Sequence, residues 1–158
     1  MKRVVYIETT IPSFYQEVRT EPEMIARRNW TREWWNNQRE HYQLVTSIAV
    51  IEELERGDYP NKEKILNLVA DIPLLSINME IHDIVETYIK RKLMPADILG
   101  DALHLAIASF HGCDFLLTWN CKHLANANKF SHIRRLNALL GLYVPALITP
   151  VELLSWEE

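Results

Sequence analysis

The sequence contains few glycines and no long hydrophobic run. Only four of its 158 residues are glycine, so we expect neither a flexible glycine-rich linker nor a disordered tail. No stretch approaches the roughly 20 consecutive apolar residues that a membrane-spanning helix needs. The first apolar run stops at Glu8, whereas a secretory signal has a core of roughly 7–15 apolar residues. We therefore expect a cytoplasmic protein with no membrane partner.

Cysteine is scarce too, and basic residues are not in excess. The two cysteines, Cys113 and Cys121, flank an apolar segment typical of a strand, which would separate them beyond the ~7 Å Cα limit of a disulfide. Unpaired thiols suit a reducing cytoplasm. The net charge of −4 argues against a protein that coats nucleic acid. It does not argue against a nuclease, since a carboxylate site lowers the total charge while basic residues cluster elsewhere.

The patterning that is present predicts one α/β domain. A chain of this length with 48% apolar residues is large enough for a single hydrophobic core. Short β-branched and aromatic runs predict strands at 4–7, 43–46, 74–77, 115–118 and 143–148. Helical patterns and their end signals predict helices at 21–41, 48–56, 63–70, 79–92, 98–110, 124–140 and 151–156. Apolar strands that alternate with helices predict a three-layer fold, with a parallel sheet of about five strands covered on both faces.

Acidic residues follow two of the predicted strands. In such sheets ligands bind outside the carboxyl ends of the strands, and Glu8 directly follows the first one. Glu52 and Glu53 lie one helical turn beyond the second strand, and spacing alone does not choose between them. Each has a structural alternative, because Glu8 could cap the next turn and a helical glutamate usually faces solvent.

Asp101 stands at the start of an otherwise apolar helix. Removing an unpaired charge from water costs several kcal/mol, and the helix dipole returns only about 0.3–1 kcal/mol. A bound cation would be sufficient to offset the cost of burying the Asp101 charge. The alternative role is helix capping, for which Asp97 is better placed; four residues from Asp101, it could also join the same site.

Carboxylate oxygens favour a hard cation such as Mg²⁺ or Mn²⁺, which activates water and neutralises charge on phosphoryl oxygens. Thr10 could hydrogen-bond to the carboxylate of Glu8. The six histidines form neither an HExxH motif nor a zinc-type Cys/His spacing. We therefore expect His104, on the apolar helix, to be a core or supporting residue rather than a metal ligand.

Four segments, in this order, resemble the motifs of the PIN-domain family, particularly its VapC-like toxin ribonucleases: YIETTIPSFY, TSIAVIEELERG, GDALHLAIAS and LLTWNCKHLAN. The resemblance implies a Rossmann-like PIN fold and Mg²⁺- or Mn²⁺-dependent cleavage of RNA. It favours Glu53 over Glu52, because the family's glutamate precedes Leu and lies four residues before Gly. The implied metal ligands are Glu8, Glu53 and Asp101, with Asn120 as a further catalytic residue. With Thr10 and Asp97 from the reasoning above and Thr118 and His123 from the fourth motif, the candidate supporting residues are Thr10, Asp97, Thr118 and His123.

The same resemblance implies partners. It implies a homodimer, an RNA substrate and, for a type II toxin, an antitoxin whose peptide occupies the groove. Glu8 stands where the family normally has Asp, and Asn120 and His123 stand where it often has acids. Among the basic residues, Lys122 and Lys129 are nearest the fourth motif and are the candidates for contact with RNA.

Two other functions remain open from the sequence. The altered first and fourth motifs are compatible with a non-catalytic PIN-like module that binds RNA or protein. A phosphotransfer domain fits less well, because it needs an Asp nucleophile at a strand end and the first strand offers Glu8 without a second acid in DxD spacing. Trp30 and Trp34 share a helix face, which indicates core packing or, alternatively, a dimer or antitoxin contact.

Overall fold

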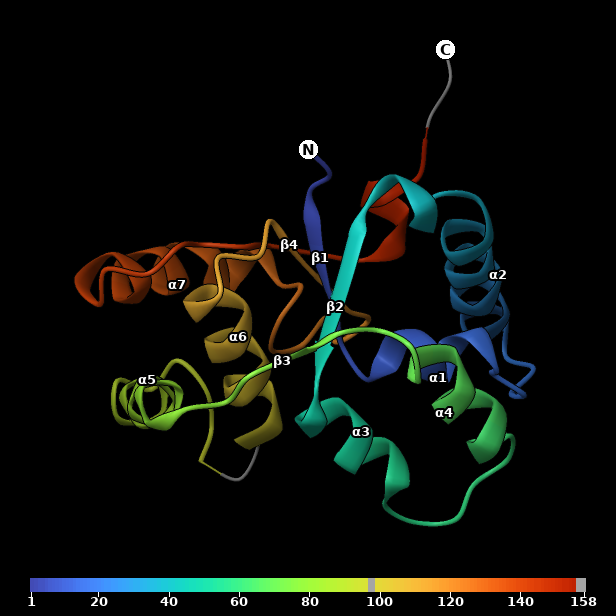
Figure 1. Ribbon diagram of the computed structural model, residues 1–158, viewed down its shortest axis with the longest axis horizontal. Helices are drawn as coiled ribbons and strands as arrows, with labels where there is room; N and C mark the ends of the chain where they lie inside the picture. The colour runs from blue at the N-terminus through green and yellow to red at the C-terminus, as the bar shows by residue number, and fades with distance from the viewer. Residues whose placement is uncertain (97–98, 156–158) are drawn as a thin grey trace.

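The computed structural model describes residues 1–96 and 99–155, which contain a five-stranded sheet. Its strands are β1 (Val4–Ile7), β2 (Gln43–Ser47), β3 (Leu74–Leu75), β4 (Phe115–Leu117) and β5 (Ala146–Ile148). All neighbouring pairs are parallel, in the order β3-β2-β1-β4-β5 (Figure 1). This is a Rossmann-like order, with the chain reversing direction across the sheet between β1 and β4.

Helices cover both faces of the sheet. The α-helices of the described chain are α1 (Thr10–Tyr15), α2 (Pro22–Asn37), α3 (Ile48–Glu55), α4 (Lys62–Val69), α5 (Met79–Lys90), α6 (Leu99–Phe110) and α7 (Ala127–Leu139). Two 3₁₀ turns, η1 (Arg39–His41) and η2 (Pro150–Leu153), complete it. In Figure 1, α5, α6 and α7 lie on one side of the strands, and α1, α2 and α4 lie on the other. The predicted three-layer α/β fold is confirmed.

Local sequence signals explain several element boundaries. The side chain of Asn78 accepts a hydrogen bond from the Ile81 amide at 3.1 Å and caps α5. Gly57, with φ of 74°, follows α3 in the left-handed conformation that favours glycine. The apolar stripe of α5, formed by Ile81, Ile84, Val85 and Tyr88, is buried and belongs to the continuous core. Strand β5 lies at a sheet edge, where Pro145 just before it is tolerated.

Some predicted boundaries were wrong. The structure has a helix at Thr10–Tyr15 that the sequence pattern did not predict. The long helix predicted at 21–41 ends at Asn37 and continues as η1. The helix predicted at 124–140 starts at Ala127, because the Asn126 side chain accepts a hydrogen bond from the Asn128 amide and caps it there.

The other differences concern the ends of short elements. The strands predicted at 74–77 and 143–148 are shorter, at two and three residues. In place of the helix predicted at 151–156, the described residues form a 3₁₀ turn at Pro150–Leu153, with a capping box between Thr149 and Glu152. The predicted end at Trp156 lies outside the described residues. The predicted start of α6 at Ile98 lies outside the described residues.

Three further expectations concern the tryptophans, the cysteines and the membrane. Trp34 is fully buried, as core packing requires, whereas Trp30 is 38% exposed and stacks on Trp119 with ring centroids 6.3 Å apart. Cys113 is buried, Cys121 is exposed, and both are free thiols. Within the described residues, the helices are too short or too polar to cross a bilayer.

Candidate metal centre

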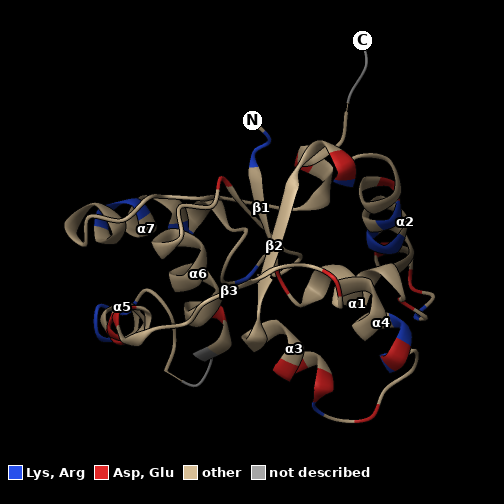
Figure 2. Cartoon of the chain, in the orientation of Figure 1, with Lys and Arg blue, Asp and Glu red and all other residues tan. Residues whose placement is uncertain are grey.

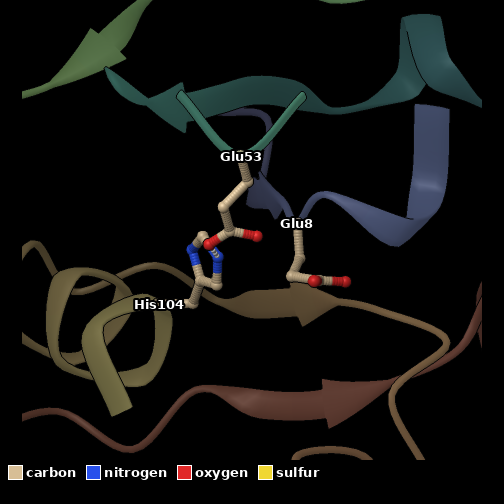
Figure 3. A group of neighbouring side chains, drawn as sticks. All are labelled: Glu8, Glu53 and His104. Atoms are coloured by element: carbon tan, nitrogen blue, oxygen red, sulfur yellow. Dashed lines mark hydrogen bonds and ion pairs between the residues drawn. The ribbon is translucent and has the colours of Figure 1, made fainter. Parts of the chain in front are cut away.

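Three side chains meet beyond the carboxyl ends of the central strands. They are Glu8, which follows β1, Glu53 on α3 and His104 on α6 (Figure 3). One potential ligand atom from each lies within 4.8 Å of the other two. This is the position at which the strand order reverses, where ligands bind in open α/β sheets.

The Glu8 carboxylate is buried among neutral donors, and its residue is only 4% exposed. Its Oε1 accepts hydrogen bonds from the Thr10 amide at 3.1 Å, the Thr10 hydroxyl at 2.5 Å and the Thr118 hydroxyl at 2.6 Å. Burial raises the pKa of Glu8, and this effect is only partly opposed by the charge of His104 and by the threonine hydrogen bonds. Among the described residues, Oε2 accepts none of these bonds, so it is left for another ligand.

The two threonines also fix the loop that follows β4. Thr10 Oγ1 accepts a hydrogen bond from the Trp119 amide at 2.8 Å, and Thr118 Oγ1 accepts one from the Asn120 amide at 2.9 Å. Both predicted supporting threonines therefore contact Glu8. They tie the exits of β1 and β4 to the same carboxylate.

Glu53 is held by a hydrogen bond on each carboxylate oxygen. Its Oε1 lies 2.7 Å from His104 Nε2, and its Oε2 accepts from the Thr9 hydroxyl at 2.7 Å. Burial acts to raise its pKa, but the hydrogen bonds of His104 and Thr9 and the charge of His104 outweigh it, so the pKa is lowered. Gly100 lies against this carboxylate, and a Cβ at that position would be 3.0 Å from Glu53 Oε1.

His104 forms the centre of a buried polar chain. Its residue is 1% exposed, its Nδ1 lies 2.7 Å from the Tyr6 hydroxyl, and that hydroxyl lies 2.8 Å from Ser47 Oγ. Burial acts to lower the pKa of His104, but the hydrogen bond and charge of Glu53, with the charges of Glu8 and Asp101, raise it. Both ring nitrogens have protein partners, and the Nε2 contact orients Glu53. Because His104 also belongs to the group of potential ligands, its supporting role stays a prediction.

Asp101 lies beside this group rather than within it. It stands in the first turn of α6 and is partly buried, but it is not a member of the set of described ligand atoms within 4.8 Å. Burial raises its pKa; hydrogen bonding from Asn120 and the charges of His123 and His104 oppose the rise, and Glu53 adds to it. Of the three acids expected to meet, Glu8 and Glu53 lie close together. Asp101 is outside this group but near enough for the Glu53 charge to raise its pKa.

The fourth-motif residues form a chain leading away from Asp101. Asn120 Oδ1 accepts a hydrogen bond from the His123 amide at 3.0 Å, and His123 Nδ1 lies 3.3 Å from Lys129 Nζ. Lys122 is exposed and contributes only its carbonyl, which accepts from the side chain of Asn126. Asp97, the other expected supporting residue, lies outside the described residues.

Sequence reasoning missed Thr9, Tyr6 and Gly100. Tyr6 carried a usable signal, because a tyrosine in an otherwise apolar buried strand needs a partner for its hydroxyl. Gly100 carried another, since a glycine inside a helix is unfavourable unless something approaches its backbone closely. Nothing in the local pattern distinguishes Thr9 from a turn residue.

The donor set fits a divalent cation. Glu8 and Glu53 place two carboxylates close together, and within the described chain the only ion pair of either is with His104. One imidazolium cannot balance two buried carboxylates and nearby Asp101, and burying an unbalanced charge is costly. Oxygen-rich sites of this kind suit Mg²⁺ or Mn²⁺.

No protein-family model matches the chain, and neither does any curated protein. Function is therefore inferred from the residues and their geometry.

Proposed function

We propose that this protein is a Mg²⁺- or Mn²⁺-dependent endoribonuclease of the PIN-domain kind. The observation that carries the proposal is the Glu8 carboxylate, which is buried against Glu53 with only neutral hydrogen-bond donors on its Oε1. A cation that shares Glu8 and Glu53 removes the electrostatic cost of that arrangement. The order of the four resembling motifs supports the reaction class.

The roles of the side chains follow from their contacts. Glu8, through Oε2, and Glu53 would hold the cation, and Asp101 would complete the site from the first turn of α6. When bound, the cation supplies activation of a water and neutralisation of charge on the phosphoryl oxygens. Thr10 and Thr118 keep Glu8 aimed at the site. Thr9 and His104 do the same for Glu53.

The test is cleavage of a labelled single-stranded RNA by the full chain, with Mg²⁺ or Mn²⁺ and with a chelator. We expect cleavage only with the cation, and a loss of about 100-fold or more in Glu53→Gln and Asp101→Asn, because each removes a charge from the site. Glu52→Gln is the matched control, since Glu52 is the exposed neighbour on the same helix. It should cleave at the wild-type rate.

The result that would contradict the proposal is equal activity in the wild type and in both site variants. RNA binding without cation-dependent cleavage would instead identify the chain as the non-catalytic binding module. A Mn²⁺ titration followed by electron paramagnetic resonance separates these outcomes further, because it reports cation binding whether or not RNA is cleaved.

We further propose that the chain is the toxin of a type II toxin–antitoxin pair and forms a homodimer. The support is the resemblance to VapC-like toxins. Expression of the chain in a bacterial host should arrest growth, and Asp101→Asn should relieve the arrest. Co-expression of a small DNA-binding protein encoded beside its gene should also relieve it, and sedimentation of the purified chain should give the dimer mass. Unimpaired growth would contradict the toxin proposal without contradicting the ribonuclease proposal.

A further inference from the structure

A pocket of about 410 Å³ opens between the end of α5 and the first turns of α7. Its lining combines an apolar floor with basic groups: Ile89, Lys92, Leu93, Met94, Pro95, Ala96, Lys129 and His132. Leu93 and Met94 are each 2% exposed, so the floor is part of the folded core rather than a loose surface. Within the described part of the chain, no acidic residue lines the pocket.

The pocket unites two basic segments that are far apart in the sequence. Lys92 ends the run 90–92, and Lys129 and His132 belong to α7. Figure 2 colours Lys and Arg positions along both α5 and α7, which lie on the same side of the sheet as α6. The net charge of the chain is −4. Basic residues nevertheless outnumber acidic ones around this pocket, and the sequence does not show this because the two segments are far apart in it.

Lys129 is a fixed charge rather than a mobile surface lysine. Its Nζ donates to the Leu93 carbonyl at 2.9 Å and lies 3.8 Å from Met94 Sδ and 3.3 Å from His123 Nδ1. A lysine held in this way has already lost the side-chain freedom that binding an anion would otherwise remove. Lys129 is also one of the residues that line the pocket.

The same contacts connect the pocket to the candidate metal centre. Lys129 interacts with Asp101 through charge and with His123 directly. The His123 amide donates to Asn120 Oδ1, and the Asn120 side chain in turn acts to lower the pKa of Asp101. The pocket therefore lies on the side of the candidate metal centre that Asp101 occupies.

From this arrangement we infer that the pocket is a nucleotide subsite for the RNA strand. The phosphate group lies between Lys92, Lys129 and His132, and the base lies against Ile89 and Met94. An inorganic anion would use only the basic groups, and an apolar peptide only the floor; a nucleotide matches both, because its phosphate is charged and its base has apolar faces. This inference rests on the proposed function, since it names the place where the substrate is held beside the metal centre.

The first experiment measures binding without cleavage. The full chain, with labelled Ile and Met methyl groups and in chelator, is titrated with uridine 5′-monophosphate, adenosine 5′-monophosphate, inorganic phosphate or an acidic hexapeptide. We expect both nucleotides to shift the methyl resonances of Ile89 and Met94 and the ring resonances of His132. Inorganic phosphate should shift only His132. Unmoved Ile89 and Met94 methyls would overturn the inference, as would shifts produced by the peptide and not by the nucleotides.

The second experiment compares two lysines two residues apart. Lys92 has φ of 60°, a conformation that Asn and Asp tolerate better than most residues, so Lys92→Asn and Lys92→Asp preserve the turn. Lys90→Asn and Lys90→Asp are the matched controls, since Lys90 is equally exposed but does not line the pocket. We expect Lys92→Asn to weaken RNA binding by about 3–10-fold and Lys92→Asp to weaken it by more. The slope of log binding constant against log salt concentration should become shallower by about 0.7, the value for one lost contact with a single-strand phosphate.

Equal effects at Lys90 and Lys92 would show nonspecific attraction and would overturn the subsite. Failure of the subsite is distinguishable from failure of the proposed function. If the chain cleaves RNA but both lysines behave alike, only the subsite is wrong. If the nucleotides bind in the pocket but no cation-dependent cleavage occurs, the subsite inference is supported and the ribonuclease proposal is wrong. The chain would then be a nucleotide-binding protein without hydrolase activity.

Discussion

His104 Nε2 lies 2.7 Å from Glu53 Oε1, and this contact joins α6 to α3 across the candidate metal centre. On its other side the imidazole meets the Tyr6 hydroxyl of β1 at 2.7 Å. A strand and two helices thus set the direction of one carboxylate. Residues that hydrogen-bond to a metal ligand without touching the metal commonly contribute about 10–100-fold to metal affinity. The hydrogen-bonded chain from Tyr6 through His104 to Glu53 can therefore be tested by metal binding, separately from catalysis.

We predict that Tyr6→Phe weakens Mn²⁺ binding by about 10–100-fold, because it leaves His104 Nδ1 without its partner and frees the ring to turn. It should also lower the free energy of unfolding by about 1–3 kcal/mol. The control is Tyr88→Phe, since Tyr88 is a buried tyrosine whose hydroxyl bonds to Asn137 at 2.6 Å. It should lose similar stability and keep its Mn²⁺ affinity. Paramagnetic titration and urea unfolding measure the two quantities; equal affinities in the two variants would refute the positioning role.

Gly100→Ala should change stability and metal affinity in opposite directions. Alanine is favoured over glycine inside a helix by about 0.5–1 kcal/mol. However, its methyl would stand 3.0 Å from Glu53 Oε1 and displace the carboxylate. We expect an unchanged or raised unfolding free energy and about 10-fold weaker Mn²⁺ binding. The effect should vanish in a Glu53→Ala background, which removes the carboxylate that the methyl displaces. A persistent effect there would mean that the methyl acts elsewhere.

Thr118→Val tests the support of Glu8. The change removes the hydroxyl that donates to Glu8 Oε1 at 2.6 Å, so the pKa of Glu8 should rise further and Mn²⁺ binding near neutral pH should weaken by about 10-fold. Thr46→Val is the control, because Thr46 is equally buried and donates to the Ile7 carbonyl at 2.8 Å. Calorimetric titration of both variants should show the loss only at Thr118. A similar loss at Thr46 would point to a general structural effect.

The metal-free protein should become less stable as the pH rises. Burial raises the pKa of Glu8 above its ordinary value of 4.5, so the folded state holds a proton that the unfolded chain has already released. The stability that this proton contributes is lost as the pH rises through the raised pKa of Glu8 in the folded protein. His104 acts in the same direction, because its raised pKa gives stability below 6.5 that is lost as the pH passes the folded value.

Urea unfolding in chelator between pH 5 and 8 measures this dependence. Glu8→Gln cannot ionise, so its stability should exceed that of the wild type increasingly as the pH rises. Added Mn²⁺ should stabilise the wild type most at high pH and Glu8→Gln little. A wild-type stability that rises with pH, or that follows the variant in parallel, would contradict the assignment of Glu8 as an uncompensated buried carboxylate.

The sequence by itself determined the five strands, most of the helices and the position of the first acid, but not the helix α1. Apolar runs located every strand of the sheet, and Asn78 and Gly57 marked helix ends, because capping and β-branching act over a few residues. Glu8 was predictable as a candidate site residue, since a carboxylate directly after a buried strand of an α/β sheet lies where ligands bind.

Only the tertiary structure decided which side chains meet. Thr118 and Glu8 are 110 positions apart, and His104 and Glu53 are 51 apart. No local pattern pairs them, because the strand order brings β4 beside β1 and sets α6 against α3. The same packing excluded Asp101 from the tight group and closed Lys92 and Lys129 around one pocket. Sequence patterns fix what each segment becomes, whereas contacts between distant segments depend on how the whole core packs.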